Sequence, residues 1–120
     1  CTVEFRPTAN RYANMKPNLT LGSAYAENYR ALGEDISETP GGGGSTDMGN
    51  VSQVVPSLHP YVAIAPPSVA GHSIEFCEAA GSEAGRKGTI LGAKALAMTA
   101  VDCFTDADLQ AAMLAEFKRT

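Results

Sequence analysis

The sequence is short of cysteine, of basic residues and of long apolar runs, and each shortage excludes a class of protein. The three cysteines, Cys1, Cys77 and Cys103, are odd in number and form no Cys-x-x-Cys pair. A disulfide framework or a structural zinc site is therefore a poor interpretation, and reduced thiols in a cytoplasmic protein fit better. A net charge of -4 argues against nucleic-acid binding. No apolar run approaches the ~18 residues of a membrane span, and no signal-peptide pattern is present.

The remaining composition is that of a folded domain. The chain has 120 residues, of which 44% are hydrophobic and 18% charged, enough to build a core. It starts without Met, inside residues 1–6, where apolar and polar side chains alternate as in a half-buried strand. We therefore expect upstream residues to exist elsewhere, as a separate chain after cleavage or as a part missing from a fragment.

Periodicity and end signals predict three helices, over about residues 17–32, 82–104 and 106–118. Gly33 is a suitable stop for the first. The second is rich in Ala, Leu and Met with few charges, so we expect it to be mostly buried. Thr105 is the predicted cap of the third.

Three short segments, residues 1–6, 51–55 and 61–65, read as strands. The order strand, helix, strand, strand, helix, helix is typical of an α/β fold in which a sheet is layered with helices.

A glycine-rich segment over residues 41–50 is the first candidate site. Glycines let a backbone approach a ligand closely, and successive exposed N–H groups can form an anion nest, here for a substrate carboxylate. The alternative is a flexible linker, although Ser45, Thr46 and Asp47 directly behind the glycines favour a shaped loop. A structural role for Asp47 would be to hydrogen-bond local backbone N–H groups.

His72 is the second candidate, because it follows a strand and precedes a helix, where α/β enzymes place ligands. Imidazole is a common zinc ligand, but a lone histidine is more often an ordinary surface or core residue. The same applies to His59. Glu75 and Glu78 lie three residues apart, and a solvated helix face is their favoured interpretation over acid–base work. No nucleophile–base pair is visible.

Two segments carry a family resemblance. Residues 44–52, continued by Val55-Pro56 and His59-Pro60, resemble the glycine-rich active-site segment of the aminoacylase and carboxypeptidase G family of co-catalytic zinc peptidases. Within it, the p-aminobenzoyl-glutamate hydrolase subunits and β-alanyl dipeptidases look nearest. Residues 71–76 resemble the family's C-terminal His-Ser motif, and a helix like residues 88–97 follows it in the proper place.

The resemblance implies the C-terminal segment of a zinc exopeptidase-like α/β catalytic domain, with a mixed sheet layered with helices. Residues 1–16 would end a lid and dimerisation domain on its last strand, and residues 17–120 would form the C-terminal part of the catalytic domain. His72 matches the family's final metal-ligand histidine. The wall that receives the substrate's carboxylate end would comprise Gly43, Gly44, Ser45, Thr46, Asp47 and Asn50.

The implied activity is hydrolysis of the amide bond of an N-acyl amino acid or dipeptide. Two zinc ions would activate a water, with a glutamate as general base. In the family these other ligands and that glutamate lie upstream, and they have no counterparts here. The resemblance therefore implies a partner, the upstream part of the same catalytic domain, as well as homodimerisation through the lid. The alternative is a non-catalytic binding module, or a member repurposed for condensation or cyclisation.

Overall fold

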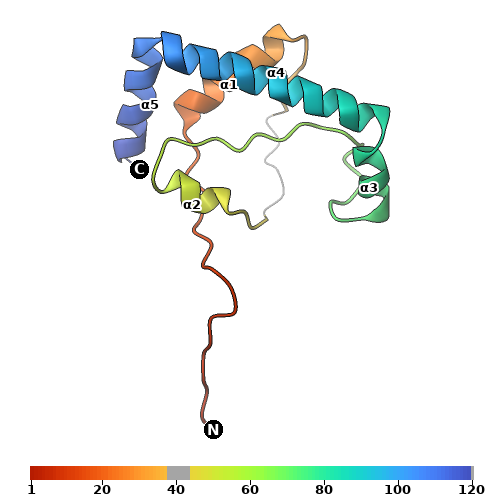
Figure 1. Ribbon diagram of the computed structural model, residues 1–120, viewed down its shortest axis with the longest axis vertical. Helices are drawn as coiled ribbons and strands as arrows, with labels where there is room; N and C mark the ends of the chain where they lie inside the picture. Colours follow the sequence, from red (N-terminus) through yellow and green to blue (C-terminus); the bar gives the residue numbers. More distant parts are fainter. Residues whose placement is uncertain (38–43, 120) are drawn as a thin grey trace.

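The computed structural model describes residues 1–37 and 44–119, and the regular elements within these residues are helices. Figure 1 shows the longest helix, α4, crossing the molecule, with α1, α3 and α5 packed against it. The short helix α2 lies apart from α4, beside the connection that follows it. The five helices are α1 Leu19–Ala31, α2 Met48–Ser52, α3 Ile74–Ala80, α4 Glu83–Thr105 and α5 Ala107–Arg119.

Side-chain caps explain where the long helices begin and end. Asn18 Oδ1 accepts a hydrogen bond from Leu21 N at 2.9 Å, which starts α1. Gly33 ends it with φ of 89°, a left-handed conformation that glycine adopts without strain. Ser82 Oγ accepts from Gly85 N at 3.3 Å and starts α4. The predictions for these two helices are confirmed.

The predicted cap of the last helix is wrong by one residue. Asp106 Oδ1 accepts hydrogen bonds from Asp108 N and Leu109 N at 2.9 and 3.0 Å. Thr105 still belongs to α4, and its hydroxyl donates back to Val101 O at 2.9 Å. A carboxylate accepts hydrogen bonds and donates none. Asp106 therefore bonds the free N–H groups at the start of α5, whereas the Thr105 hydroxyl donates back into α4.

Helix α5 closes the N-terminal end of α1. Glu116 accepts hydrogen bonds from Leu19 N at 2.7 Å, from Thr20 N at 2.8 Å and from the Thr20 hydroxyl at 2.6 Å. The Thr20 hydroxyl, followed by these two amides, lowers the pKa of the Glu116 carboxyl below its ordinary value. Asn18 Nδ2 also donates to Met113 O at 2.9 Å. Of the free N–H groups that every helix start presents, those of Leu19 and Thr20 are thereby satisfied from α5.

The predicted strand at residues 61–65 runs along α4 and contacts it at two glycines. A Cβ at Gly88 would lie 2.7 Å from Ile64 Cγ2, and a Cβ at Gly92 would lie 3.3 Å from Val62 Cγ2. Small residues on α4 therefore let this segment lie directly on the helix. Within the described part of the chain it pairs with no other strand, and the one β-bridge there joins Pro17 to Ser57 in parallel.

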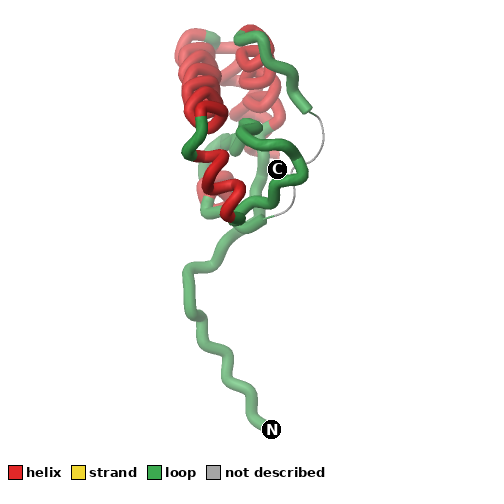
Figure 2. Tube along the Cα trace, turned by 90° about the vertical axis from the view of Figure 1, so that its right-hand side faces the viewer, coloured by secondary structure: helices red, strands yellow, loops and turns green. Residues whose placement is uncertain are grey.

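The other two predicted strands also lack a ladder. The prediction for residues 51–55 is wrong, because Val51 belongs to α2 and its carbonyl then accepts from Val54 N and Val55 N at 3.0 and 3.1 Å. Residues 1–10 leave the body of the molecule as an extended tail (Figure 2). A strand needs a neighbour for its backbone groups, so the sheet and the domain division at residue 16 stay predictions.

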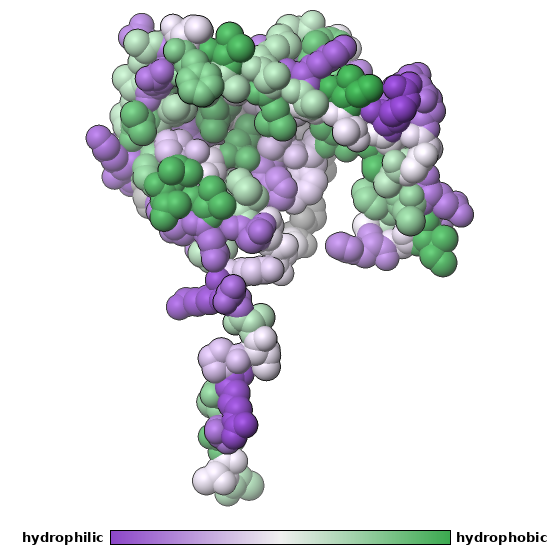
Figure 3. Space-filling model, viewed as in Figure 1, coloured by the Kyte–Doolittle hydropathy of each residue, from purple (hydrophilic) through white to green (hydrophobic). Residues whose placement is uncertain are grey.

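The molecule has a very small core of its own. Among the described residues, Tyr25 and Ala95 are the buried hydrophobic ones. The chain exposes 9052 Å², whereas a compact monomer of its mass exposes about 6,200 Å². The radius of gyration is 17.3 Å, against roughly 14 Å for a compact domain of this length. The expectation that α4 is mostly buried is wrong for this chain alone, since Phe104 is 82% exposed. Figure 3 shows apolar side chains spread over the surface.

Candidate functional site

The glycine-rich segment leads directly into α2. Gly43 lies outside the described residues. Gly44 and Ser45 are exposed, and Thr46 is half-buried. The Thr46 hydroxyl accepts from Met48 N at 3.2 Å and shapes the entry to the helix. Asp47 occupies the cap position of α2, but its exposed carboxylate makes no capping hydrogen bond, so the local structural role considered for it is taken by Thr46.

A groove runs between this loop and the segment that precedes α1. Gly44, Ser45 and Thr46 form one wall, residues 12–15 form the other, and the space between them is about 590 Å³. Among the described residues no hydrogen-bond acceptor meets the backbone N–H groups of the three loop residues. Backbone N–H groups that meet no protein acceptor can donate hydrogen bonds to a ligand. The loop therefore has donors to offer a carboxylate.

Asn50 is placed differently from the loop residues. Its side-chain Oδ1 accepts from Ala13 N at 2.7 Å, and its Nδ2 donates to Arg11 O at 3.1 Å. Both ends of the amide are thus engaged by the backbone that forms the opposite wall of the groove. Asn50 holds that wall, and its place on the substrate-contacting surface remains a prediction.

His72 lies in the turn before α3 and has φ of 62°. This left-handed conformation is uncommon for a residue with a side chain and clusters at functional sites. Its ring is exposed, and the next residue, Ser73, caps α3 by accepting from Phe76 N at 3.1 Å. Helix α3 therefore fixes the backbone from which the imidazole projects.

The carboxylates near His72, those of Glu75 and Glu78, belong to helix α3 and have local or solvent-exposed environments. Hydrogen bonds from its own backbone N–H and from the Ser73 hydroxyl lower the pKa of Glu75. Glu78 is exposed, which fits the solvated helix face. His59 lies 5.1 Å from the ring of Tyr61, measured between centroids. These contacts are those of local structure.

The described residues supply one candidate metal ligand and no complete set. No group of three or more His, Cys, Asp or Glu side chains comes together among them. A catalytic zinc takes three protein ligands, so His72 fits the chemistry of one ligand and the rest of a site would have to come from elsewhere. Figure 1 shows α2 and α3 on opposite sides of the molecule. His72 is not among the residues that line the groove at the glycine-rich loop.

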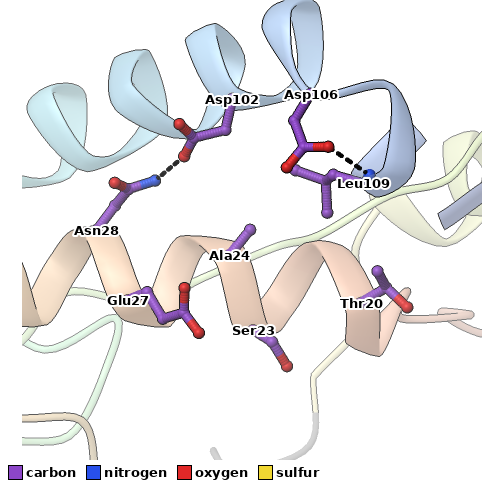
Figure 4. A pocket seen from close by; sticks show the side chains of 8 residues that line it. All are labelled: Thr20, Ser23, Ala24, Glu27, Asn28, Asp102, Asp106 and Leu109. Carbon is purple, nitrogen blue, oxygen red and sulfur yellow. Dashed lines mark hydrogen bonds between the residues drawn. The ribbon is translucent and has the colours of Figure 1, made fainter. Parts of the chain in front are cut away.

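A larger hollow of about 610 Å³ lies between α1 and the junction of α4 with α5. Figure 4 shows Glu27, Asp102 and Asp106 around it. Two of these carboxylates are already engaged, because Asp102 accepts from Asn28 Nδ2 at 2.6 Å and Asp106 caps α5. Their chemistry is that of helix packing.

The sequence analysis did not identify residues 12–15 as part of a candidate site. Their contact with α2 spans 36 or more positions along the chain, and no local pattern announces it. The available signal was a run of small polar side chains within residues 49–53, suited to bonding a neighbouring backbone.

Comparison with curated proteins relates the chain to dipeptide-cleaving hydrolases, while no protein-family model matches it. The relatives carry the name Xaa-Arg dipeptidase. The mouse protein (Mus musculus) is 48% identical over 122 aligned residues and the human protein (Homo sapiens) 46% identical over the same length. In both cases the match covers 98% of this chain and 28% of the relative. The predicted relationship to dipeptidases is confirmed at that level. Separately, no helix in the described ranges is both long and apolar enough to cross a membrane.

Proposed function

We propose that this chain is the part of a metal-dependent dipeptidase that binds the carboxylate end of the substrate and supplies one metal ligand. Similarity to two Xaa-Arg dipeptidases across 98% of the chain carries the proposal. The name of these relatives suggests dipeptides with a C-terminal arginine as substrates. Hydrolysis would add one water across the amide C–N bond and release free arginine.

The groove supports the first role. The N–H groups of Gly44, Ser45 and Thr46 would receive the carboxylate of the arginine residue. Charge-assisted hydrogen bonds to a carboxylate are about twice as strong as neutral ones, so three amides would fix the substrate's end firmly. Asp47 directly follows these three residues, and its carboxylate is exposed.

His72 supports the second role. Zinc would supply Lewis-acid polarisation of the amide and an activated water. Because no group of three or more candidate ligands comes together among the described residues, no reaction step through the metal is assigned to this chain. The remaining ligands and the general-base glutamate would come from the upstream part of the catalytic domain.

Exposed surface and free backbone support that missing partner. No hydrogen bond joins the backbone of residues 61–65 to any described residue. Burial alternates along it, with Tyr61 and Ala63 exposed and Val62 and Ile64 half-buried against α4. This is the pattern of a sheet strand that lacks its neighbours. We therefore propose that a sheet completed by the upstream part covers α4, as in an α/β exopeptidase fold. Homodimerisation through a lid stays a prediction.

Release of arginine from an Xaa-Arg dipeptide by the isolated native protein, with all of its chains present, tests the function. We expect hydrolysis that a chelator removes and zinc restores. His72→Ala should abolish it, whereas His59→Ala, the matched control from the same chain, should retain it. A zinc-supplemented native protein that hydrolyses no dipeptide would refute the proposal and leave a binding module or a repurposed enzyme.

A further inference from the structure

Side-chain hydrogen bonds join helix α2 and the residue after it to the segment before α1, residues 11–16. Besides the two bonds of Asn50, Gln53 Nε2 donates to Asn14 O at 2.8 Å and Ser52 Oγ accepts from Lys16 N at 2.9 Å. Ser52 is fully buried and donates in turn to Gly49 O at 2.6 Å. We call Gly49, Asn50, Ser52 and Gln53 the α2 clip.

The clip forms hydrogen bonds with the backbone of residues 11–16, as a neighbouring strand of a sheet would. It takes backbone donors at residues 13 and 16 and backbone acceptors at residues 11 and 14. Gly49 permits the approach, because a Cβ there would overlap the carbonyl oxygen of Ala13. Two exposed side-chain amides and one buried hydroxyl thus replace a β-ladder.

Both walls of the groove depend on this one short helix. Residues 44–46 run covalently into α2, and residues 12–15 are held to α2 by the clip. The width of the groove is therefore set by how firmly the clip holds. Within the described chain, the hydrogen bond from Asn50 to Arg11 is also the last tie before residues 1–10 leave the body (Figure 1).

We infer that Asn50 is a positioning residue: it sets the width of the substrate groove by holding residues 11–13 and makes no contact with the substrate itself. The inference rests on the proposed function in that the groove is taken to receive the dipeptide. A wall that binds substrate and transition state equally affects KM and leaves kcat unchanged. Loss of the clip is therefore expected to appear in KM.

The test compares Asn50→Ala with Asn50→Asp in the native protein. Asn50→Ala removes both bonds, and we expect KM for an Xaa-Arg dipeptide to rise about 10-fold, with kcat within about 2-fold. Binding energy lost equally from substrate and transition state appears in KM alone, and about 1.4 kcal/mol of it is a tenfold change in affinity. Asn50→Asp keeps an acceptor for Ala13 N and loses the donor to Arg11 O, so its KM should lie between. Asn28→Ala is the matched control, since it removes a comparable tether between α1 and α4 and should leave KM unchanged.

Amide hydrogen exchange separates this inference from the proposed function. The N–H of Ala13 should exchange faster in Asn50→Ala and stay protected in Asn50→Asp and in Asn28→Ala. If the parent protein hydrolyses no dipeptide, the proposed function fails while exchange at Ala13 still decides whether the clip holds. An unchanged KM and unchanged exchange in Asn50→Ala would overturn the inference. So would a fall in kcat at constant KM, which would indicate contact with the reacting atoms. If Asn50→Ala does not fold, Asn50→Asp, which loses only the bond to Arg11 O, carries the test, and an unchanged KM in that variant would overturn the inference.

Discussion

Gly49→Ala tests the closest approach in the molecule. Alanine normally stabilises a helix position relative to glycine by about 0.5–1 kcal/mol. At residue 49, however, the new Cβ would overlap the backbone carbonyl of Ala13. Backbone atoms cannot rotate aside as a side chain can, so residues 11–16 must retreat from α2 and strain or break the four hydrogen bonds of the clip.

The magnitude follows from those bonds. Each contributes about 0.5–1.5 kcal/mol, toward the lower end for the exposed ones made by Asn50 and Gln53. If all four hydrogen bonds break, the loss is about 2–4 kcal/mol. This sum is the upper limit of the destabilisation, because residues 11–16 can detach from α2 once the strain exceeds it. After the helix gain is subtracted, we expect Gly49→Ala to destabilise the protein by roughly 1–3 kcal/mol.

Gly22→Ala is the matched control. It also replaces a helical glycine, in α1, but its Cβ would lie 3.6 Å from Leu58 Cδ1, which is ordinary contact. We expect this variant to gain about 0.5–1 kcal/mol. Urea denaturation followed by helical circular dichroism measures both changes. A Gly49→Ala protein as stable as the parent, with the Ala13 amide still protected, would refute the reasoning.

Three further perturbations have directions fixed by the structure. The pKa of Glu116 is lowered in the folded protein. Its bonds to Thr20 therefore stabilise the fold above the ordinary carboxyl pKa, and this stabilisation is lost as pH falls through the pKa of the folded state. In an acid titration, Glu116→Gln should lose less helicity than the parent protein. Gly88→Val should displace Ile64, whose Cγ2 already lies 2.7 Å from a Cβ at this position, and cost about 1–3 kcal/mol in thermal unfolding; an unchanged Tm would contradict that packing. His72→Gly relieves a left-handed φ worth roughly 1 kcal/mol, so stability should hold or rise while hydrolysis is lost; retained hydrolysis would remove His72 from the metal site.

Local signals predicted the long helices well and the packing of the chain poorly. Asn18, Gly33 and Ser82 mark helix ends because caps act within a few residues. Val51, Val54 and Val55 suggested a strand because β-branched residues favour pleated surfaces. The structure places Val51 in α2 instead, since Ser52 and Gln53 find backbone partners in residues 14–16. A contact 36 or more residues distant overrides a weak local preference.

In the candidate site too, local sequence predicted some features, whereas contacts between distant residues determined the others. Sequence reasoning identified the loop of residues 44–46 from its glycines and its small polar neighbours. It could not find the opposite wall, because nothing in residues 12–15 suggests a binding role until α2 is seen to hold them. Nor could it place His72 relative to the loop, since that depends on the course of the connection between α2 and α3, which runs along α4 (Figure 1).

The glycine-rich motif thus divides its work between two adjoining stretches. The N–H groups of residues 44–46 meet no acceptor within the described chain, while Asn50, Ser52 and Gln53 bond the segment before α1. The first set of groups is available to a ligand, whereas the second set holds the opposite wall of the groove in place. Substitutions in the first stretch should therefore change which anions bind, and substitutions in the second should weaken the binding of all of them alike. Competition between carboxylate ligands of different size, measured on one variant from each stretch, distinguishes these outcomes; equal effects from both stretches would show that the motif acts as a single unit.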